Sequence, residues 1–273
     1  RMVRAGPASV AAGQTALLKF ESCDRHGNRR TNGGDPFAIQ LEVDPSNADP
    51  SARAYAALTG GALGDTPVLM DVSDGVVQAP PQPAVLDGCD GVYTVAYGWS
   101  HAGGLLLSIC DAHGSPIHGS PFHLDVVADA PSAAQSAAHG AWLSSGGVAG
   151  VAMHVTVVLR DQYHNVCAQL PDGVSCALRG PVEVQGTIGS FTRGGLTGVE
   201  AVMTPSVAER YWLLLAHNGE PIGASPYSVY VRPGAASPHH AELWGEGLTT
   251  AVAGEVAYFA VQLRDSLKNA TAD

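Results

Sequence analysis

One five-residue segment recurs along this 273-residue chain. Asp24–Asn28 returns as Asp161–Asn165 and again as Asp265–Asn269, each time with Asp first and Asn last. A second segment, Ile117–Phe122, returns as Ile222–Tyr227 around a shared Ser-Pro pair. The second Ser-Pro pair follows the first by 105 positions, and the third Asp follows the second by 104. A fixed period of this length predicts tandem copies of one small domain, and tandem modules usually position partners rather than perform chemistry.

The repeats predict where the domains lie. We expect a first copy over residues 1–128, a second over 129–233 and the opening of a third over 234–273, so that the sequence is a piece of a longer protein. The first copy has 96 residues between its Asp and its Ser-Pro pair, whereas the second has 64. We assign the difference to a long surface insertion at about residues 44–83, which is rich in Ala, Gly, Pro and Asp.

Each copy opens with alternating residues that place one face of a strand on a core. The positions of that face are Ala16, Leu18, Phe20 and Ser22, then Met153, Val155, Val157 and Leu159, then Ala257, Phe259, Val261 and Leu263. Turn formers are frequent, with 33 Gly and 18 Pro, and no helical periodicity extends over twelve or more residues. Roughly seven short strands per hundred residues are typical of an immunoglobulin-like sandwich. The predicted fold class is all-β, with tandem immunoglobulin-like β-sandwich domains.

The charge of the chain excludes two classes of partner. The formal net charge is −11 and only 14% of the residues are charged. Nucleic acids and anionic membrane surfaces both need clustered Lys and Arg, and the one basic cluster, Arg25–Arg30, is short. No apolar run reaches the length of about eighteen residues that a spanning helix needs. We therefore expect no nucleic-acid partner and no membrane insertion.

Several motifs of the first copy together resemble the filamin-type immunoglobulin-like repeat. After the Asp24–Asn28 turn come Asp90–Val95, the pair Gly103–Gly104 and Ile117–Phe122, in the order that this family shows. The second copy departs from the pattern, because Thr197–Glu200 lacks the Asp and the Tyr and Ala224 replaces a Gly. The resemblance covers almost the whole chain and is specific for the fold rather than for a function.

The resemblance implies a spacer and docking module without enzymatic activity. Filamin-type repeats occur in actin cross-linkers, in ubiquitin-ligase scaffolds, in the tails of some outer-arm ciliary dynein heavy chains and in gamete adhesion proteins. We expect a cytoskeletal or ciliary assembly protein inside the cell, with dynein as one parent. The alternative is an extracellular adhesion array on a cell or gamete surface.

The sequence offers no constellation for catalysis, and we assign no catalytic, cofactor-binding or metal-binding residue. The eleven histidines lack metal-ligand spacing, and the pair His239–His240 falls in a linker. No nucleophile elbow or phosphate loop is present. Asp24 and Asn28 could be read as calcium ligands, but their recurrence around variable residues favours a structural turn.

The five cysteines do not recur at equivalent places. A secreted sandwich often has one disulfide in each module, so this irregular set favours a reducing compartment. Cys167 and Cys176 flank a predicted turn and could pair, although two free thiols is the interpretation we prefer. The triplet Asn269–Thr271 matches a glycosylation acceptor and points the other way.

A partner-binding edge is predicted in the first copy. Phe37, Ile39, Leu41 and Val43 alternate to one face of a strand that follows the Asp24–Asn28 turn. An exposed edge strand has free backbone N–H and C=O groups, which a partner strand satisfies by β-augmentation. We therefore expect other proteins to dock along this strand.

Overall fold

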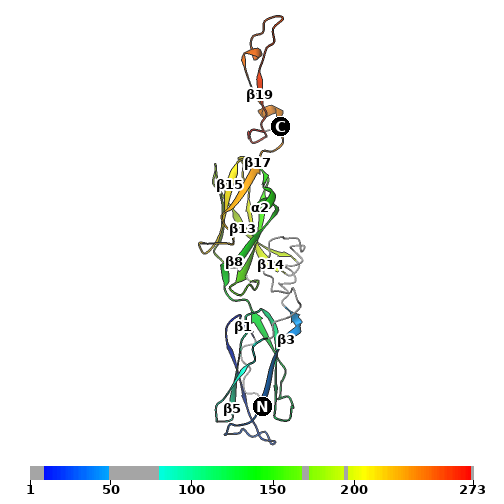
Figure 1. Ribbon diagram of the computed structural model, residues 1–273, viewed down its shortest axis with the longest axis vertical. Helices are drawn as coiled ribbons and strands as arrows, with labels where there is room; N and C mark the ends of the chain where they lie inside the picture. Colours follow the sequence, from blue (N-terminus) through cyan, green and yellow to red (C-terminus); the bar gives the residue numbers. More distant parts are fainter. Residues whose placement is uncertain (1–8, 49–79, 168–171, 194–195, 272–273) are drawn as a thin grey trace. The chain divides into compact units, whose positions relative to one another are not determined.

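The computed structural model describes residues 9–48, 80–167, 172–193 and 196–271 (Figure 1). The chain divides into two compact units. The first comprises residues 1–132, 160–169 and 192–197, and the second comprises 133–159, 170–191 and 198–273. Most of the predicted insertion at about residues 44–83 lies outside the described residues, because 49–79 are not among them.

One sheet of the first unit has the strand order β1-β7-β6-β3 among the described residues. These strands are β1 (Ser9–Ala11), β7 (Phe122–Val127), β6 (Gly103–Cys110) and β3 (Ala38–Ala48). β1 runs parallel to β7, whereas β7 and β3 are both antiparallel to β6.

The other sheet of this unit has the order β2-β5-β4, with β2 (Ala16–Glu21), β5 (Val92–Tyr97) and β4 (Ala84–Asp87). Alternation along β2 is as predicted: Leu18 and Phe20 are 1% and 2% exposed, whereas Leu17 between them is 49% exposed. A strand with one apolar and one solvated face must bury the apolar one against a second layer. The two sheets supply that layer for each other.

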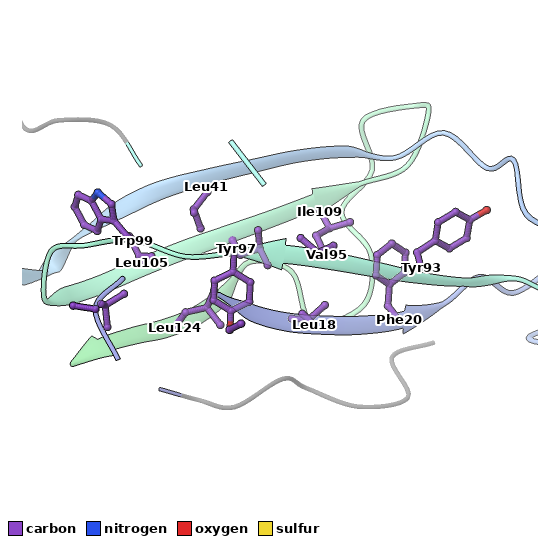
Figure 2. Packing of buried hydrophobic residues seen from close by; sticks show 14 residues of the cluster. Leu18, Phe20, Leu41, Tyr93, Val95, Tyr97, Trp99, Leu105, Ile109 and Leu124 are labelled. Carbon is purple, nitrogen blue, oxygen red and sulfur yellow. The ribbon is translucent and has the colours of Figure 1, made fainter. Parts of the chain in front are cut away.

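The core of the first unit lies between these two sheets (Figure 2). Phe20 and Tyr93 stack with ring centroids 5.4 Å apart, and Phe37 meets both rings edge-on at 4.8 Å. Leu41, Leu105 and Ile109 contribute from the facing sheet. Such aromatic pairs add stabilisation beyond the area they bury.

The second unit repeats the two-sheet arrangement. One sheet has the order β13-β14-β10-β8, and the other has β12-β11-β15-β17-β9 with β16 beside β15. Their bounds are β8 (Pro131–His139), β9 (Gly147–Val148), β10 (Met153–Asp161), β11 (Val174–Arg179), β12 (Val184–Gln185), β13 (Thr187–Arg193), β14 (Leu196–Met203), β15 (Arg210–His217), β16 (Glu220–Pro221) and β17 (Tyr227–Arg232). The predicted face of β10 is buried, with Met153, Val155 and Val157 fully enclosed. The short helix α2 (Ala141–Ser145) precedes β9.

The Ser-Pro segments have the same role in both units. The Ser120–Pro121 and Ser225–Pro226 bonds are both cis. Ser120 Oγ accepts the backbone N–H of Ile109 at 2.9 Å, and Ser225 Oγ accepts that of Leu215 at 2.9 Å. The shared spacing of the segment therefore places a serine hydroxyl where it satisfies a donor on the preceding strand.

The opening of the third copy differs from its prediction. It forms a short ladder of β18 (Glu242–Trp244) with β19 (Ala260–Gln262), flanked by the 3-10 turns η1 (Pro238–His240) and η2 (Glu246–Leu248). Phe259 and Val261 were expected on a core face, yet they are 54% and 48% exposed. Among the described residues, no second sheet faces this ladder, so the apolar face has nothing to pack against.

Candidate interaction surfaces

The three Asp-to-Asn turns have the same internal hydrogen bonds. In the first turn, Asp24 Oδ1 accepts the backbone N–H of His26 at 2.8 Å and that of Asn28 at 2.9 Å, and Asp24 Oδ2 accepts Asn28 Nδ2 at 2.9 Å. The same three bonds recur at 2.8–2.9 Å in the turns that begin at Asp161 and Asp265. N–H donors thus occupy each carboxylate, which is the arrangement of a structural turn.

In the first unit, the second of these turns also bonds outward. Asn165 Oδ1 accepts the backbone N–H of Ala102 at 2.8 Å, and Asn165 Nδ2 donates to the backbone carbonyl of Ser100 at 2.8 Å. Asp161 Oδ2 accepts the backbone N–H of Asp129 at 2.9 Å. The turn Asp161–Asn165, which we expected in the second copy, therefore bonds to Ser100 and Ala102 of the expected first copy and to Asp129 at the start of the expected second copy.

In the second unit, the third turn makes the corresponding bonds. Asn269 Oδ1 accepts the backbone N–H of Ala208 at 2.8 Å, and Asn269 Nδ2 donates to the backbone carbonyl of Ser206 at 3.0 Å. Asp265 Oδ2 accepts the backbone N–H of Gly234 at 2.8 Å. We call these two turns docking turns, and we call Ser100–Ala102 and Ser206–Ala208 their acceptor loops.

A glycine lies beside each docking turn. A Cβ added at Gly13 would stand 1.9 Å from the hydroxyl oxygen of Tyr163, and one added at Gly150 would stand 3.0 Å from Leu267 Cδ1. Tyr163 and Leu267 occupy the same position, two residues after the Asp of their turns. In both units, the side chain two residues after the Asp therefore lies over a glycine. Any residue larger than glycine at position 13 would displace the Tyr163 side chain.

The Asp residues of the two docking turns are buried. Asp161 and Asp265 are 0% and 1% exposed. Burial raises the pKa of the Asp265 carboxyl, but the hydrogen bonds from Asn269, Gly234 and Leu267 together outweigh it, and the net pKa is lowered. A buried carboxylate that accepts several N–H bonds stays ionised, since those bonds replace its hydration.

The first turn has the same internal geometry but is exposed. Every residue from Asp24 to Asn28 is classed as exposed. The Asn28 side-chain hydrogen bond is the main cause that lowers the pKa of the Asp24 carboxyl. Among the described residues, no backbone group bonds to the Asn28 side chain in the way that Ser100 and Ala102 bond to the Asn165 side chain.

The strand that we predicted to bind a partner corresponds to β3 and the residue before it, and its use by a partner remains a prediction. β3 pairs with β6 on one side, and no described strand pairs with its other side. The four named side chains turn toward the core: Leu41 is buried, and Phe37, Ile39 and Val43 pack partly against it. Ala38, Gln40 and Glu42 are exposed on the outer face. A partner strand at this edge would therefore meet the backbone of β3 rather than these four side chains.

β4 forms a second exposed edge among the described residues, which the residue pattern did not predict. β4 is the last described strand of the β2-β5-β4 sheet, and all four of its residues are exposed. Val85 and Leu86 are 40% and 60% exposed, an apolar pair on an unpaired edge of the described sheet. The signal was present as the short run Ala84-Val85-Leu86, but it follows the insertion and lacks a clear alternation.

An open cavity of about 580 Å³ lies at the first turn. Phe20, Phe37 and Ile117 form apolar parts of its wall, and Asp24 and Asp111 contribute carboxylates. Hydrogen bonds from the backbone of Ser115 and His113 lower the pKa of Asp111. The cavity therefore has a mixed lining of apolar, acidic and basic side chains, the last including Arg25 and Arg30.

None of the five cysteines forms a disulfide. Burial is the main cause that raises the pKa of Cys167 to about 12 and that of Cys176 to about 11. In the part of the chain that the structure describes, no cluster of three or more His, Cys, Asp or Glu side chains is arranged for a metal ion. Within those same residues, no helix is long and apolar enough to cross a bilayer.

The outward bonds of the docking turns were also missed by sequence reasoning. Each acceptor loop contributes only backbone groups, so no residue pattern marks it. One signal was available in the chemistry of Asn. Its amide has two N–H donors and one acceptor oxygen, and the turn uses a single donor. The recurrence of Asn, rather than of any turn-forming residue, indicates that the other groups have partners.

No protein-family model and no curated protein sequence matches the chain. Solved structures do match. The Escherichia coli adhesin FdeC is 20% identical with a TM-score of 0.62, over 96% of this chain and 72% of that one. Invasin, a bacterial integrin-binding protein, is 13% identical with a TM-score of 0.58, over 95% of this chain and 46% of that one. Yersinia pseudotuberculosis InvD is 14% identical with a TM-score of 0.53, over 97% and 70%.

At these identities the likeness concerns the fold alone. The described residues are all-β, and the neighbours bear out the predicted immunoglobulin-like class. The chain spans less than half the length of the invasin chain.

Proposed function

We propose that the chain is part of a non-enzymatic adhesion or interaction protein at a cell surface, built as a serial array of immunoglobulin-like repeats. The repeats are residues 1–128, 129–233 and the opening of a third at 234–273. Each docking turn, with its acceptor loop and linker, forms a joint that ties one repeat to the next.

The observation that carries this proposal is the duplicated joint. Asn165 and Asn269 make the same pair of bonds to main-chain groups of their acceptor loops, at 2.8–3.0 Å. Asp161 and Asp265 each accept one linker N–H, from 32 and 31 residues earlier in the chain. Bonds that recur at nearly the same spacing in two places support an array of repeats rather than one isolated domain.

The fold neighbours favour the cell surface over the ciliary or cytoskeletal alternative. FdeC is described as an adhesin and invasin as an integrin-binding protein. The filamin-type motifs of the first copy remain compatible with this placement, since immunoglobulin-like sandwiches serve many proteins. One observation favours an intracellular assembly protein as the second candidate, namely five cysteines without a disulfide among them.

We further propose that the free side of β3 accepts a partner strand. Its outer residues Gln40 and Glu42 are exposed, and its inner ones hold the core. The test compares amide exchange along Phe37–Val43 with and without a bound partner. Protection that appears elsewhere and not on β3 would overturn this assignment.

The joint itself is tested by Asn165→Ala, with Asn28→Ala as the matched control. Both changes remove the Nδ2 bond within the turn, but only the first removes the bonds to Ser100 and Ala102. Two hydrogen bonds at about 0.5–1.5 kcal/mol each predict a further loss of about 1–3 kcal/mol for Asn165→Ala. The backbone amide hydrogen of Ala102 should exchange faster in Asn165→Ala than in the unsubstituted chain. Its exchange rate should stay the same in Asn28→Ala. Equal exchange in the two variants would contradict the joint.

The cellular location is tested on intact cells of the native source. A membrane-impermeant biotin reagent that labels lysines and free amines should label the protein before lysis. The same reagent applied after lysis gives the total. Labelling that requires lysis would favour the intracellular alternative, and a full count of five reduced cysteines under denaturing conditions would agree with it.

A further inference from the structure

The exposed Asp24–Asn28 turn retains the groups that the two docking turns use. Asn28 uses one N–H on Asp24, which leaves its second N–H and its Oδ1 for a partner. The same atoms of Asn165 bond to Ser100 and Ala102. The internal bonds of the first turn already hold the side chain in the docked geometry, so docking would require little ordering.

We propose that Asp24–Asn28 is itself a docking turn, and that its partner is a further immunoglobulin-like repeat with an open acceptor loop. This inference rests on the proposed function, since it extends the joint to the first repeat. His26 stands where Tyr163 and Leu267 stand. The partner repeat therefore carries a glycine with positive φ that lies against the His26 side chain, in the way that Gly13 lies against the Tyr163 side chain.

A second molecule of this chain does not fit the partner's description. Asn165 occupies the acceptor loop Ser100–Ala102, and Asn269 occupies Ser206–Ala208. Neither of these loops is open to another turn. The partner is instead a repeat tethered ahead of Asp24, because both proposed joints use a linker donor 31 or 32 residues before the Asp.

Arg25 adds a condition on that linker. It occupies the position of Gln162, whose Nε2 donates to the Asp129 carboxylate at 3.1 Å. In the exposed turn, the one hydrogen bond described for the Arg25 side chain goes to His26. An Arg at this position pairs best with a carboxylate. The partner's linker should therefore have an acidic residue where Asp129 stands.

The experiment extends the full chain with its own first repeat. A second copy of residues 9–145 is placed directly before residue 9, which sets the added Asp129 at 32 residues before the original Asp24, as in the natural joint. Hydrogen exchange is followed on the peptide that contains Asp24–Asn28, which now occurs twice. We expect two isotope envelopes of equal size: one as in the unextended chain, and one slower by about tenfold or more.

Asn28→Ala at the original position separates the two peptides by mass. We expect the substituted peptide to exchange at the same fast rate in the extended and the unextended chain. The same change in the added copy should leave the slow envelope intact. Asp129→Asn in the added linker should make the slow envelope faster, because it removes the carboxylate for Arg25.

Two controls make the result decisive. A single slow envelope for β6 (Gly103–Cys110) shows that the added repeat is folded. If the added repeat does not fold, a copy of residues 128–249 takes its place. The added Gly234 then lies 31 residues before the original Asp24, as it lies before Asp265 in the natural chain. One fast envelope for the first turn, with the Asp161–Asn165 peptide still slow, would overturn this inference alone. Fast exchange of the Asp161–Asn165 peptide as well would overturn the joint of the proposed function.

Discussion

Gly13 lies directly beneath the phenol ring of Tyr163, so that a Cβ at Gly13 would stand 1.9 Å from the Tyr163 hydroxyl oxygen. The contact joins the turn between β1 and β2 to a turn about 150 positions further along the chain. Tyr163 also packs against the core cluster of the first unit. The absence of a side chain at Gly13 is thus what allows the docking turn to approach.

Gly13→Ala should therefore destabilise the first unit more than a glycine substitution with backbone strain alone. Gly114→Ala is the matched control, because its φ of 78° is close to the 77° of Gly13 and nothing lies within 4 Å of a Cβ added there. The control should cost about 1–2 kcal/mol from left-handed strain, and Gly13→Ala about 1–3 kcal/mol more from overpacking. Urea unfolding measures both. If the double variant Gly13→Ala/Tyr163→Ala loses less free energy of unfolding than the two single variants lose together, the Tyr163 ring is the cause of the overpacking. Equal losses in Gly13→Ala and Gly114→Ala would refute the overpacking.

Ser120→Ala should lower the free energy of unfolding by about 1–3 kcal/mol, because it leaves the part-buried N–H of Ile109 without its acceptor. Ser225→Ala should lower the free energy of unfolding by a similar amount, because it removes the acceptor of the Leu215 backbone N–H. Ser115→Ala is the control, since that side chain is exposed. Chemical denaturation gives the three values. A loss at Ser120 no larger than that at Ser115 would show that the hydroxyl contributes nothing.

The second docking joint should weaken in acid. The pKa of Asp265 lies below its ordinary value of 3.8 in the folded chain, because hydrogen bonds to the carboxylate outweigh its burial. A carboxyl with a lowered folded pKa contributes stability that is fully present above pH 3.8 and is lost as the pH falls through the folded value. Exchange of the Ala208 amide, measured between pH 5 and about pH 2, should accelerate in that window after correction for intrinsic rates. Asp265→Asn should flatten this dependence, and an unchanged profile in that variant would assign the effect elsewhere.

Thiol reactivity should separate the cysteines by burial. Cys89 is exposed and should be alkylated rapidly by iodoacetamide at pH 8. Cys167 and Cys176 are buried with pKa values raised to about 12 and about 11, so their thiolate fractions are small and their reaction should be slower by at least about a hundredfold. Mass spectrometry of the labelled peptides gives the rates. Alkylation of Cys167 as fast as that of Cys89 would show that its surroundings open in solution.

The alternation of residues predicted the inner faces of β2 and β10, because a period of two follows directly from strand geometry. It also predicted that Leu41 faces a core. It failed at Phe259 and Val261, since periodicity reports which residues share a face and not whether another layer covers that face. The use of β3 by a partner remains a prediction.

The turns were predictable in their internal bonds and not in their external ones. Asp and Asn at a fixed spacing indicate a turn whatever lies between them. Their outward partners are main-chain groups of Ser100 and Ala102, more than 60 residues earlier. Every residue offers such groups, so only a three-dimensional arrangement distinguishes these two from the rest.

Recognition through the main chain has a consequence for how such proteins diverge. Asn165 and Asn269 bind amide and carbonyl groups that remain when the loop side chains change. In the proposed array, neighbouring repeats would therefore be free to drift apart in sequence, or to be gained, lost and exchanged, while each keeps its own Asp and Asn. A lineage under pressure to alter its outer surface could renew it one repeat at a time and leave the linkage between repeats unchanged.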